Sequence, residues 1–200
     1  MKKMALLLLV IFLLLAGCGT AKVTRVDINT LTDLSGYWND QDVRIVCESL
    51  INDCLSSPRV DQAIKAMKNK TPAVIVGTFR NESSEHIDTS IITSIMETTI
   101  FNTGKMDFIA SGAKREALRA ERQDQLVNAS EETAASLANE TGADFMLLGS
   151  VKTIVDKAGN KTVRTYFINA ELTNIETNQR IWMGQNTEIK KLITRPKVKL

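Results

Sequence analysis

The feature that most constrains the fold is a run of three apolar-rich segments near the C-terminus, residues 144–155, 161–175 and 180–190. Two short stretches of turn-forming residues, 157–160 and 176–179, separate them. In the middle segment apolar side chains alternate with polar ones, which gives a strand one buried face. The alternating apolar residues are Tyr166, Ile168, Ala170 and Leu172. Strands joined by such short turns run antiparallel, so the sequence predicts a three-stranded C-terminal meander.

A strand–helix–strand unit is predicted upstream of the meander. Residues 73–79 are mostly β-branched and apolar, which is typical of a strand covered on both faces. A polar loop over residues 80–85 leads to a helix expected over residues 86–102, with Asp88 as its N-cap. A glycine ends that helix, and residues 105–110 are expected to form a short strand.

Further helices are predicted on both sides of that unit. A helix over residues 40–55 follows Asn39, a favourable N-cap, and Asp42 lies three residues further on. A second helix begins at Pro58, because proline suits the first helical position. The last two expected helices are residues 111–122 and 130–140. The sequence therefore predicts an α/β fold: a mixed sheet of four to five strands, helices packed against it, and an antiparallel C-terminal meander.

Two cysteines lie within the first predicted helix. Cys47 and Cys54 are separated by two helical turns, or about 10 Å along the axis. A disulfide requires Cα atoms within about 7 Å of each other. Val43 and Leu50 complete an apolar stripe with the two cysteines, so both thiols are predicted to be buried and free. A disulfide remains the alternative if this segment is not helical.

The N-terminus has the pattern of an export signal. Lys2 and Lys3 precede the apolar residues 4–16, a run shorter than a bilayer-spanning helix needs. The run ends Leu-Ala-Gly-Cys, with the cysteine at Cys18, which resembles a lipobox, the bacterial lipoprotein signal. A plain signal peptide or a spanning helix is the alternative. The expected divisions are a signal peptide (1–17), a lipidated N-terminus with a short tether (18–30), one α/β domain (31–192) and a basic tail (193–200).

Charge narrows the possible partners. The chain has 25 basic and 23 acidic residues, so removal of Lys2 and Lys3 with the signal peptide would bring its formal net charge to zero. A chain without a basic field is not expected to bind nucleic acid. One local excess of cations remains at the C-terminus, in Lys190, Lys191, Arg195, Lys197 and Lys199. A solvated, frayed terminus is the expectation there, and contact with an acidic surface or a membrane is the alternative.

Patterns typical of an active site are lacking in the sequence. His86 is the single histidine, and zinc sites need three or four ligands at motif spacing. Ser83 and Ser84 lie too near His86 in sequence to form a triad with it, and no Gly-x-Ser-x-Gly elbow is present. No glycine-rich phosphate loop occurs either. We expect no catalytic residue, no metal and no cofactor, with an unrecognised hydrolase as the minor alternative.

Tyr37 and Trp38 form the one unusual local signal. They stand between Ser-Gly and Asn-Asp, outside any expected helix or strand. Aromatic residues in such a place either pack into the core as the segment crosses a sheet or anchor a partner. Core packing is the expected role, and partner binding is the alternative.

Five segments, taken in order, carry a family resemblance: residues 32–40 (TDLSGYWND), 74–83 (VIVGTFRNES), 103–109 (TGKMDFI), 142–150 (GADFMLLGS) and 171–182 (ELTNIETNQRIW). Their order and spacing resemble the LpoB family of penicillin-binding-protein activators, whose domain is similar to the N-terminal domain of TolB. The resemblance implies an outer-membrane lipoprotein lipidated at Cys18, with a monomeric soluble domain in the periplasm. It also implies binding to a class A penicillin-binding protein, a peptidoglycan synthase, without catalysis or cofactor. Gly19 after the cysteine is consistent with outer-membrane sorting.

Two expectations about the partner follow. The candidate contact residues are Tyr37, Trp38, Arg80 and Asn81. Better-known members carry a long Pro-rich linker, whereas the dozen or so tether residues here reach only about 40 Å when extended. A different synthase or docking face is therefore expected. The competing hypothesis is a lipoprotein that assembles envelope complexes or secretion pores.

Overall fold

A computed structural model describes residues 21–28, 30–68, 70–110, 112–127 and 142–196. The chain divides into two compact units, Met1–Leu31 and Thr32–Leu200. The described part of the first unit has neither helix nor strand. The predicted signal peptide, Cys18, the helix expected over residues 130–140 and the last four residues of the tail lie outside the described residues. No helix in the described ranges has both the length and the apolar character needed to cross a bilayer.

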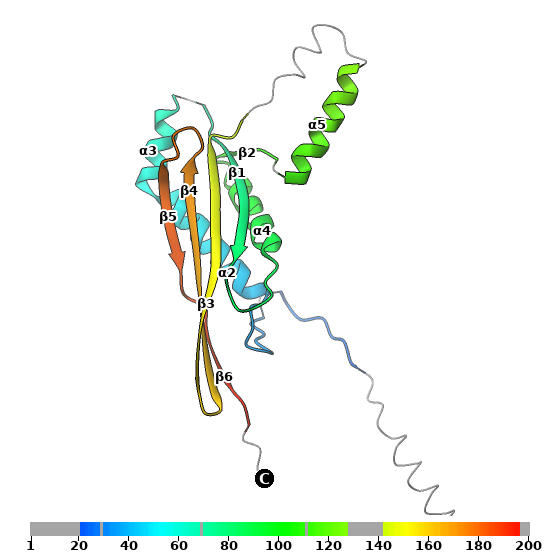
Figure 1. Ribbon diagram of the computed structural model, residues 1–200, viewed down its shortest axis with the longest axis vertical. Coiled ribbons are helices and arrows are strands. Elements are labelled where there is room, and N and C mark those ends of the chain that lie inside the picture. The colour runs from blue at the N-terminus through cyan, green and yellow to red at the C-terminus, as the bar shows by residue number, and fades with distance from the viewer. Residues whose placement is uncertain (1–20, 29, 69, 111, 128–141, 197–200) are drawn as a thin grey trace, which may run out of the picture. The chain divides into compact units, whose positions relative to one another are not determined.

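The second unit is built on a six-stranded mixed sheet (Figure 1). Its strands are β1 (Ala73–Asn81), β2 (Asp107–Phe108), β3 (Phe145–Ala158), β4 (Lys161–Asn174), β5 (Arg180–Asn186) and β6 (Lys190–Thr194). The order is β2-β1-β3-β4-β5, and β6 also pairs with β4. β1 is parallel to β2 and β3, and the remaining pairs are antiparallel. The predicted mixed sheet and C-terminal meander are confirmed.

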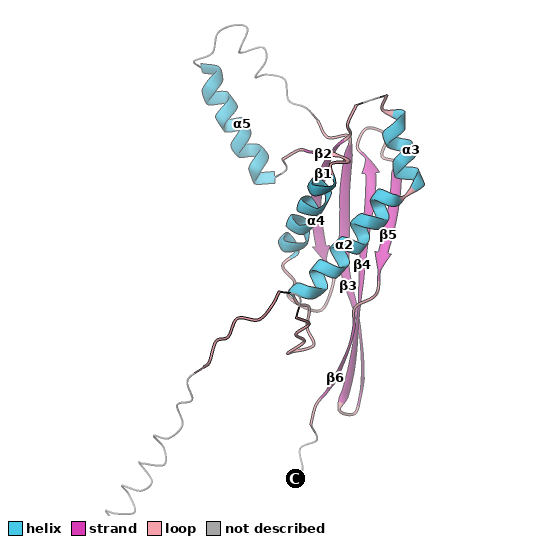
Figure 2. Cartoon of the chain, turned by 180° about the vertical axis from the view of Figure 1, so that it is seen from behind, coloured by secondary structure: helices cyan, strands magenta, loops and turns pink. Residues whose placement is uncertain are grey.

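Three helices lie on one face of this sheet (Figure 2). The described residues of this unit form the helices α2 (Asp40–Ser56), α3 (Pro58–Ala66), α4 (Thr89–Thr103) and α5 (Gly112–Val127), and the first three pack on the strands. The Asn39 side chain accepts from the Asp42 amide, and the Asp42 side chain accepts from the Asn39 amide. This reciprocal capping box confirms the predicted start of α2. Gly104 ends α4 in the left-handed conformation, with φ of 63°.

The core fills the space between α2, α4 and the covered face of the sheet. The four alternating residues of β4 are buried there, and Tyr166 and Ile168 are completely inaccessible. Cys47 and Cys54 are buried and free, which confirms the predicted stripe and excludes the disulfide. Burial raises the pKa of both thiols to about 12, because an apolar environment disfavours the thiolate.

We expect Cys47 and Cys54 to resist a thiol-specific alkylating reagent at pH 8 in the folded chain and to react fully in denaturant. Thiolate is the reacting form, and the folded chain keeps both thiols protonated. A thiol titration with and without guanidinium measures this. Stability is also expected to fall above pH 9, since the unfolded chain loses these protons near 9.0 and the folded chain only near 12. Rapid labelling of either thiol in the folded protein would contradict the buried stripe.

Several predicted boundaries were wrong. β1 continues to Asn81, so Arg80 and Asn81 lie on a strand and not in the predicted loop. α4 starts at Thr89, after the Asp88 cap, because the side chain of Asp88 accepts from the Ser90 amide. The strand expected over residues 180–190 ends at Asn186 as β5, and a further strand, β6, begins at Lys190; both pair with β4.

Candidate docking surface

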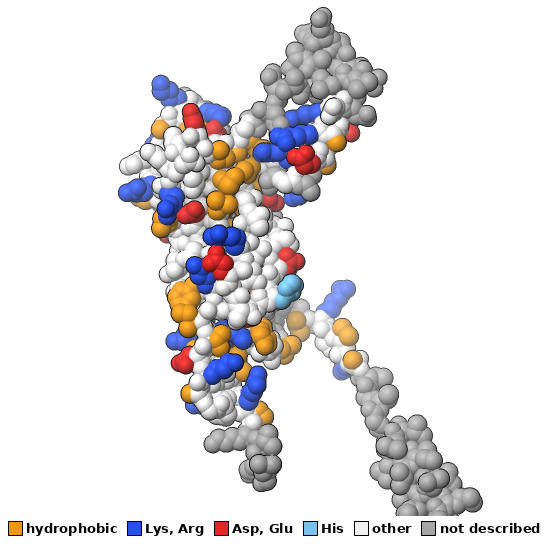
Figure 3. Space-filling view, viewed as in Figure 1, with side chains coloured by type: hydrophobic (Ala, Val, Ile, Leu, Met, Phe, Trp, Pro, Cys, Tyr) orange, Lys and Arg blue, Asp and Glu red, His pale blue; other side chains and the backbone are white. Residues whose placement is uncertain are grey.

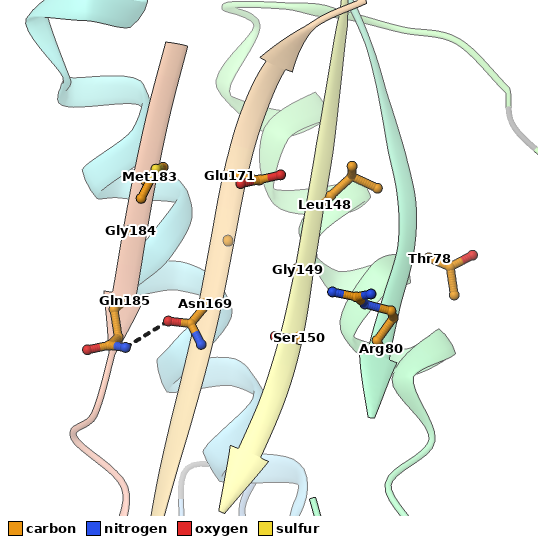
Figure 4. Close-up of a pocket in the computed structure, with 11 residues that line it drawn as sticks. Thr78, Arg80, Leu148, Gly149, Ser150, Asn169, Glu171, Met183, Gly184 and Gln185 are labelled. Carbon is orange, nitrogen blue, oxygen red and sulfur yellow. Dashed lines mark hydrogen bonds between the residues drawn. The ribbon is translucent and has the colours of Figure 1, made fainter. Parts of the chain in front are cut away.

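The face of the sheet opposite α2, α3 and α4 carries a hollow of about 660 Å³ (Figure 4). Its floor is the backbone of Gly149, Ala170 and Gly184, which are direct cross-strand neighbours on β3, β4 and β5. Its walls are longer side chains of the same strands and of β1. The wall residues are Thr78, Arg80, Leu148, Ser150, Asn169, Glu171, Met183 and Gln185.

The glycines of this floor are required by packing on the covered face. A Cβ at Gly149 would lie 2.1 Å from a ring carbon of Phe79, and one at Gly184 would lie 2.2 Å from the Trp182 ring. The two aromatic rings therefore occupy the positions that side chains would take. The missing side chains belong to the covered face, so packing of the core is what requires these glycines.

The hollow is chemically mixed and solvent-facing. Arg80 is exposed and pairs with Glu82 at 3.2 Å, and Glu82 also pairs with Lys152 at 3.1 Å. The Gln185 amide donates to Asn169 Oδ1 at 2.7 Å across the strands. Met183 is 63% exposed beside them. A surface that presents both an exposed arginine, on β1, and an exposed methionine, on β5, has a composition typical of protein–protein contacts.

The four predicted contact residues do not lie together. Arg80 lines the hollow on the open face. Asn81 holds the adjoining loop, because its amide donates to the Glu85 carbonyl and accepts from Ser83. Tyr37 and Trp38 lie on the opposite face of the sheet, where Trp38 packs against Tyr166 with ring centroids 5.1 Å apart. Trp38 is therefore part of the core edge, as expected of a core residue, while Tyr37 remains half exposed.

A buried acid joins the segment around Tyr37 to the sheet. Glu85, whose side chain is 5% exposed, lies 2.8 Å from Arg164 Nε and accepts from the Tyr166 hydroxyl at 2.9 Å and the Trp38 amide at 3.2 Å. Arg164 donates to the Gly36 carbonyl and lies 4.3 Å from the Tyr37 ring centre. Burial and the Glu85 charge raise the pKa of Tyr166. The cluster fixes the chain where it enters the domain.

A second buried cluster corrects the expected frayed tail. Lys191 on β6 is buried and lies 2.6 Å from both Asp42 and Asp33, and it donates to the Tyr37 carbonyl at 2.9 Å. Burial raises the pKa of Asp42, and the Lys191 contact opposes this rise only in part. The ordered sheet therefore continues to Thr194, because this pairing holds β6 against β4.

Sequence reasoning missed both clusters, although one signal was present. Arg164 has the same alternation as Tyr166 and Ile168, which places it on the covered face of β4. Nothing local marks Glu85 or Lys191, since their partners are far away in sequence. His86 is exposed. Within the described ranges no group of three or more His, Cys, Asp or Glu residues is arranged to hold a metal ion.

Comparison with known proteins decides the family. The sequence profile described as "peptidoglycan-synthase activator LpoB" matches residues 42–188, which is most of the chain. The chain belongs to the LpoB family. This match confirms the resemblance seen in the sequence, and it supports a general role in activating peptidoglycan synthesis as a regulator of a synthase.

Solved structures of the LpoB family are distant relatives. The LpoB C-terminal domain of Escherichia coli is 16% identical, with 73% of this chain and 97% of that one covered and a TM-score of 0.45. The same domain from Salmonella enterica has the same identity and coverage, with a TM-score of 0.43. The NMR structure of E. coli LpoB is 14% identical over 90% of this chain and 87% of that one, with a TM-score of 0.42. A search of curated proteins gave no match.

Proposed function

We propose that this LpoB-family chain is a non-catalytic lipoprotein, anchored through Cys18 in the outer membrane, that binds and activates a class A penicillin-binding protein. The single observation that carries the proposal is the family match over residues 42–188. The lipobox at residues 15–18 supports the anchor, with the domain facing the periplasm. An activator of this kind needs only a higher affinity for the active form of the synthase. It needs neither a cofactor nor a reacting group.

The docking surface that we propose for the synthase is the hollow on the open face. It is a broad concave surface on a rigid sheet, with Arg80 and Met183 exposed at its rim. Arginine and large flexible side chains are enriched where proteins bind each other. Tyr37 lies on the opposite face of the sheet, so a partner seated in the hollow does not contact it. Arg80 therefore replaces the aromatic pair as the main contact.

The activator role and the docking surface can both be tested by measuring stimulation of a purified class A synthase. The unchanged chain is expected to increase the rate of glycan polymerisation. Arg80→Glu and Met183→Glu are each expected to weaken binding about tenfold, because both place a new negative charge in the contact at the rim of the hollow. The matched control is Arg44→Glu, the same charge change on an exposed position of α2.

The outcomes separate the role from the surface. If the unchanged chain neither binds nor stimulates any class A synthase of its own organism, the activator role is wrong. If it stimulates, but Arg80→Glu and Arg44→Glu behave alike, the synthase docks on another face.

A further inference from the structure

The second surface of interest is an arm formed by one end of the sheet. We define the arm as residues 151–165, the outer part of the β3–β4 hairpin, together with β6 and Arg195. Figures 1 and 2 both show this ribbon continuing beyond the ends of α2, α3 and α4. Its covered side holds Lys191 and Arg164, whose charges are neutralised by buried acids. Its open side continues the open face of the sheet.

The open side of the arm mixes apolar and basic residues. One cross-strand row is Ile154, Thr165 and Lys190, and the next is Asp156, Val163 and Leu192. Ile154 and Leu192 are 60% and 63% exposed on this side. Scattered apolar residues on a surface need no explanation, but a cluster rimmed by cations is typical of an interaction site.

The exposed charge of the arm is strongly unbalanced. Its exposed cations are Lys152, Lys157, Lys161, Lys190 and Arg195, and Asp156 is the exposed acid among its described residues. Lys152 pairs with Glu82, and strand alternation places Lys161 and Lys190 on the open side. Figure 3 shows basic and hydrophobic side chains mixed over this end of the open face. The near-neutral balance of the whole chain therefore conceals a local positive surface. Such a surface attracts anionic groups over about a Debye length, or 8–10 Å.

The segment that leads into the domain is held on this arm. Asp33 and Gly36 bind Lys191 and Arg164, so the chain enters the domain on the arm. The residues between Cys18 and Asp33 span at most about 50 Å when fully extended. A domain tethered this closely meets the bilayer at a high effective concentration.

We propose that the open side of the arm docks on the anionic phospholipid surface of the bilayer that holds the anchor. Ile154 and Leu192 enter the interface between headgroups and acyl chains, and Lys161 and Lys190 contact lipid phosphates. Each cation near an anionic surface strengthens binding about fivefold, so the arm reinforces the lipid chains and orients the domain. The proposal rests on the proposed anchor for its location, but its test does not need the anchor.

The test uses the chain from residue 19 onward, without lipid, because the core and both ion-pair clusters lie within residues 32–196. Sedimentation with vesicles of phosphatidylglycerol and phosphatidylethanolamine is compared with vesicles of phosphatidylcholine alone. We expect binding to the anionic vesicles only, weakened by salt. Lys161→Glu with Lys190→Glu is expected to reduce binding at least twentyfold. The control, Arg44→Glu with Lys65→Glu, reverses two exposed charges on α2 and α3 and is expected to retain binding.

Each outcome bears on the proposal. Equal binding to both kinds of vesicle, no binding to either, or equal losses in the two double variants would overturn it. Protection of Cys47 and Cys54 from alkylation shows that each variant is folded. Mass spectrometry of the processed protein tests the Cys18 anchor separately, so failure of the arm and failure of the anchor are distinguishable.

Discussion

Replacing Lys191 by alanine is expected to lower the free energy of unfolding by about 3–5 kcal/mol, because removal of one partner leaves a buried charge without compensation. Asp42 is buried and lies 2.6 Å from the Lys191 ammonium, and Asp33 shares the same contact. The variant also loses the bond from Lys191 to the Tyr37 carbonyl, so the entry segment is expected to detach from β6. Equilibrium denaturation in urea measures the change.

The control is Lys190→Ala, one residue earlier on the exposed side of β6, with an expected change below about 0.5 kcal/mol. The effect of Lys191→Ala is also expected to shrink as pH falls. The pKa of Asp42 is already raised by burial, and loss of Lys191 removes a contact that lowers it. A carboxyl with a raised folded-state pKa reduces stability only above its unfolded pKa, so this cost disappears once the group is protonated. Similar losses for both variants would contradict the buried pair.

Gly149→Ala is expected to destabilise the fold by about 3 kcal/mol. The new Cβ would lie 2.1 Å from a ring carbon of Phe79 and 2.5 Å from the backbone oxygen of Asn169. The backbone oxygen belongs to the neighbouring strand β4 and has no freedom to withdraw without breaking the ladder. The Phe79 ring is itself 1% exposed and enclosed by the core. Thermal unfolding followed by circular dichroism measures the loss.

The matched control is Gly142→Ala, because nothing lies within 4 Å of a Cβ built there. That substitution is expected to change stability by less than about 0.5 kcal/mol. A second variant, Gly149→Ala with Phe79→Leu, is expected to recover part of the loss, since leucine lacks the ring edge that meets the new methyl. If Gly149→Ala is as stable as the unchanged chain, packing of the Phe79 ring is not the reason for glycine at this position.

Local signals predicted the start of α2, the buried thiols and the buried face of β4. The capping box of Asn39 and Asp42 lies within four residues, and the stripe of Cys47 and Cys54 within two helical turns. The alternation that ends in Leu172 lies within one strand. Features of this kind depend on backbone geometry over a few residues, so they can be predicted without knowledge of the partners.

Features that depend on distant partners were missed or misplaced. The division of residues 180–194 into β5 and β6 reflects two successive pairings with β4, each of which requires its own register. Lys191 has an ordinary sequence context, and only the approach of Asp33 and Asp42 explains its burial. The hollow is lined by residues of β1, β3, β4 and β5, which only strand pairing brings side by side. None of these long-range contacts can be predicted from a short segment of the sequence.

The sequence by itself determined the family, the α/β class, the order of elements and the lack of a recognisable catalytic motif, because caps, periodicity and motif order are local properties of the chain. Only the tertiary structure decided that Arg80 faces away from Tyr37, that the C-terminal cations divide into a buried lysine and an exposed basic arm, and where the sheet is hollow. The physical reason is that burial and charge pairing depend on segments more than a hundred residues apart, such as Asp42 and Lys191, which folding alone brings together.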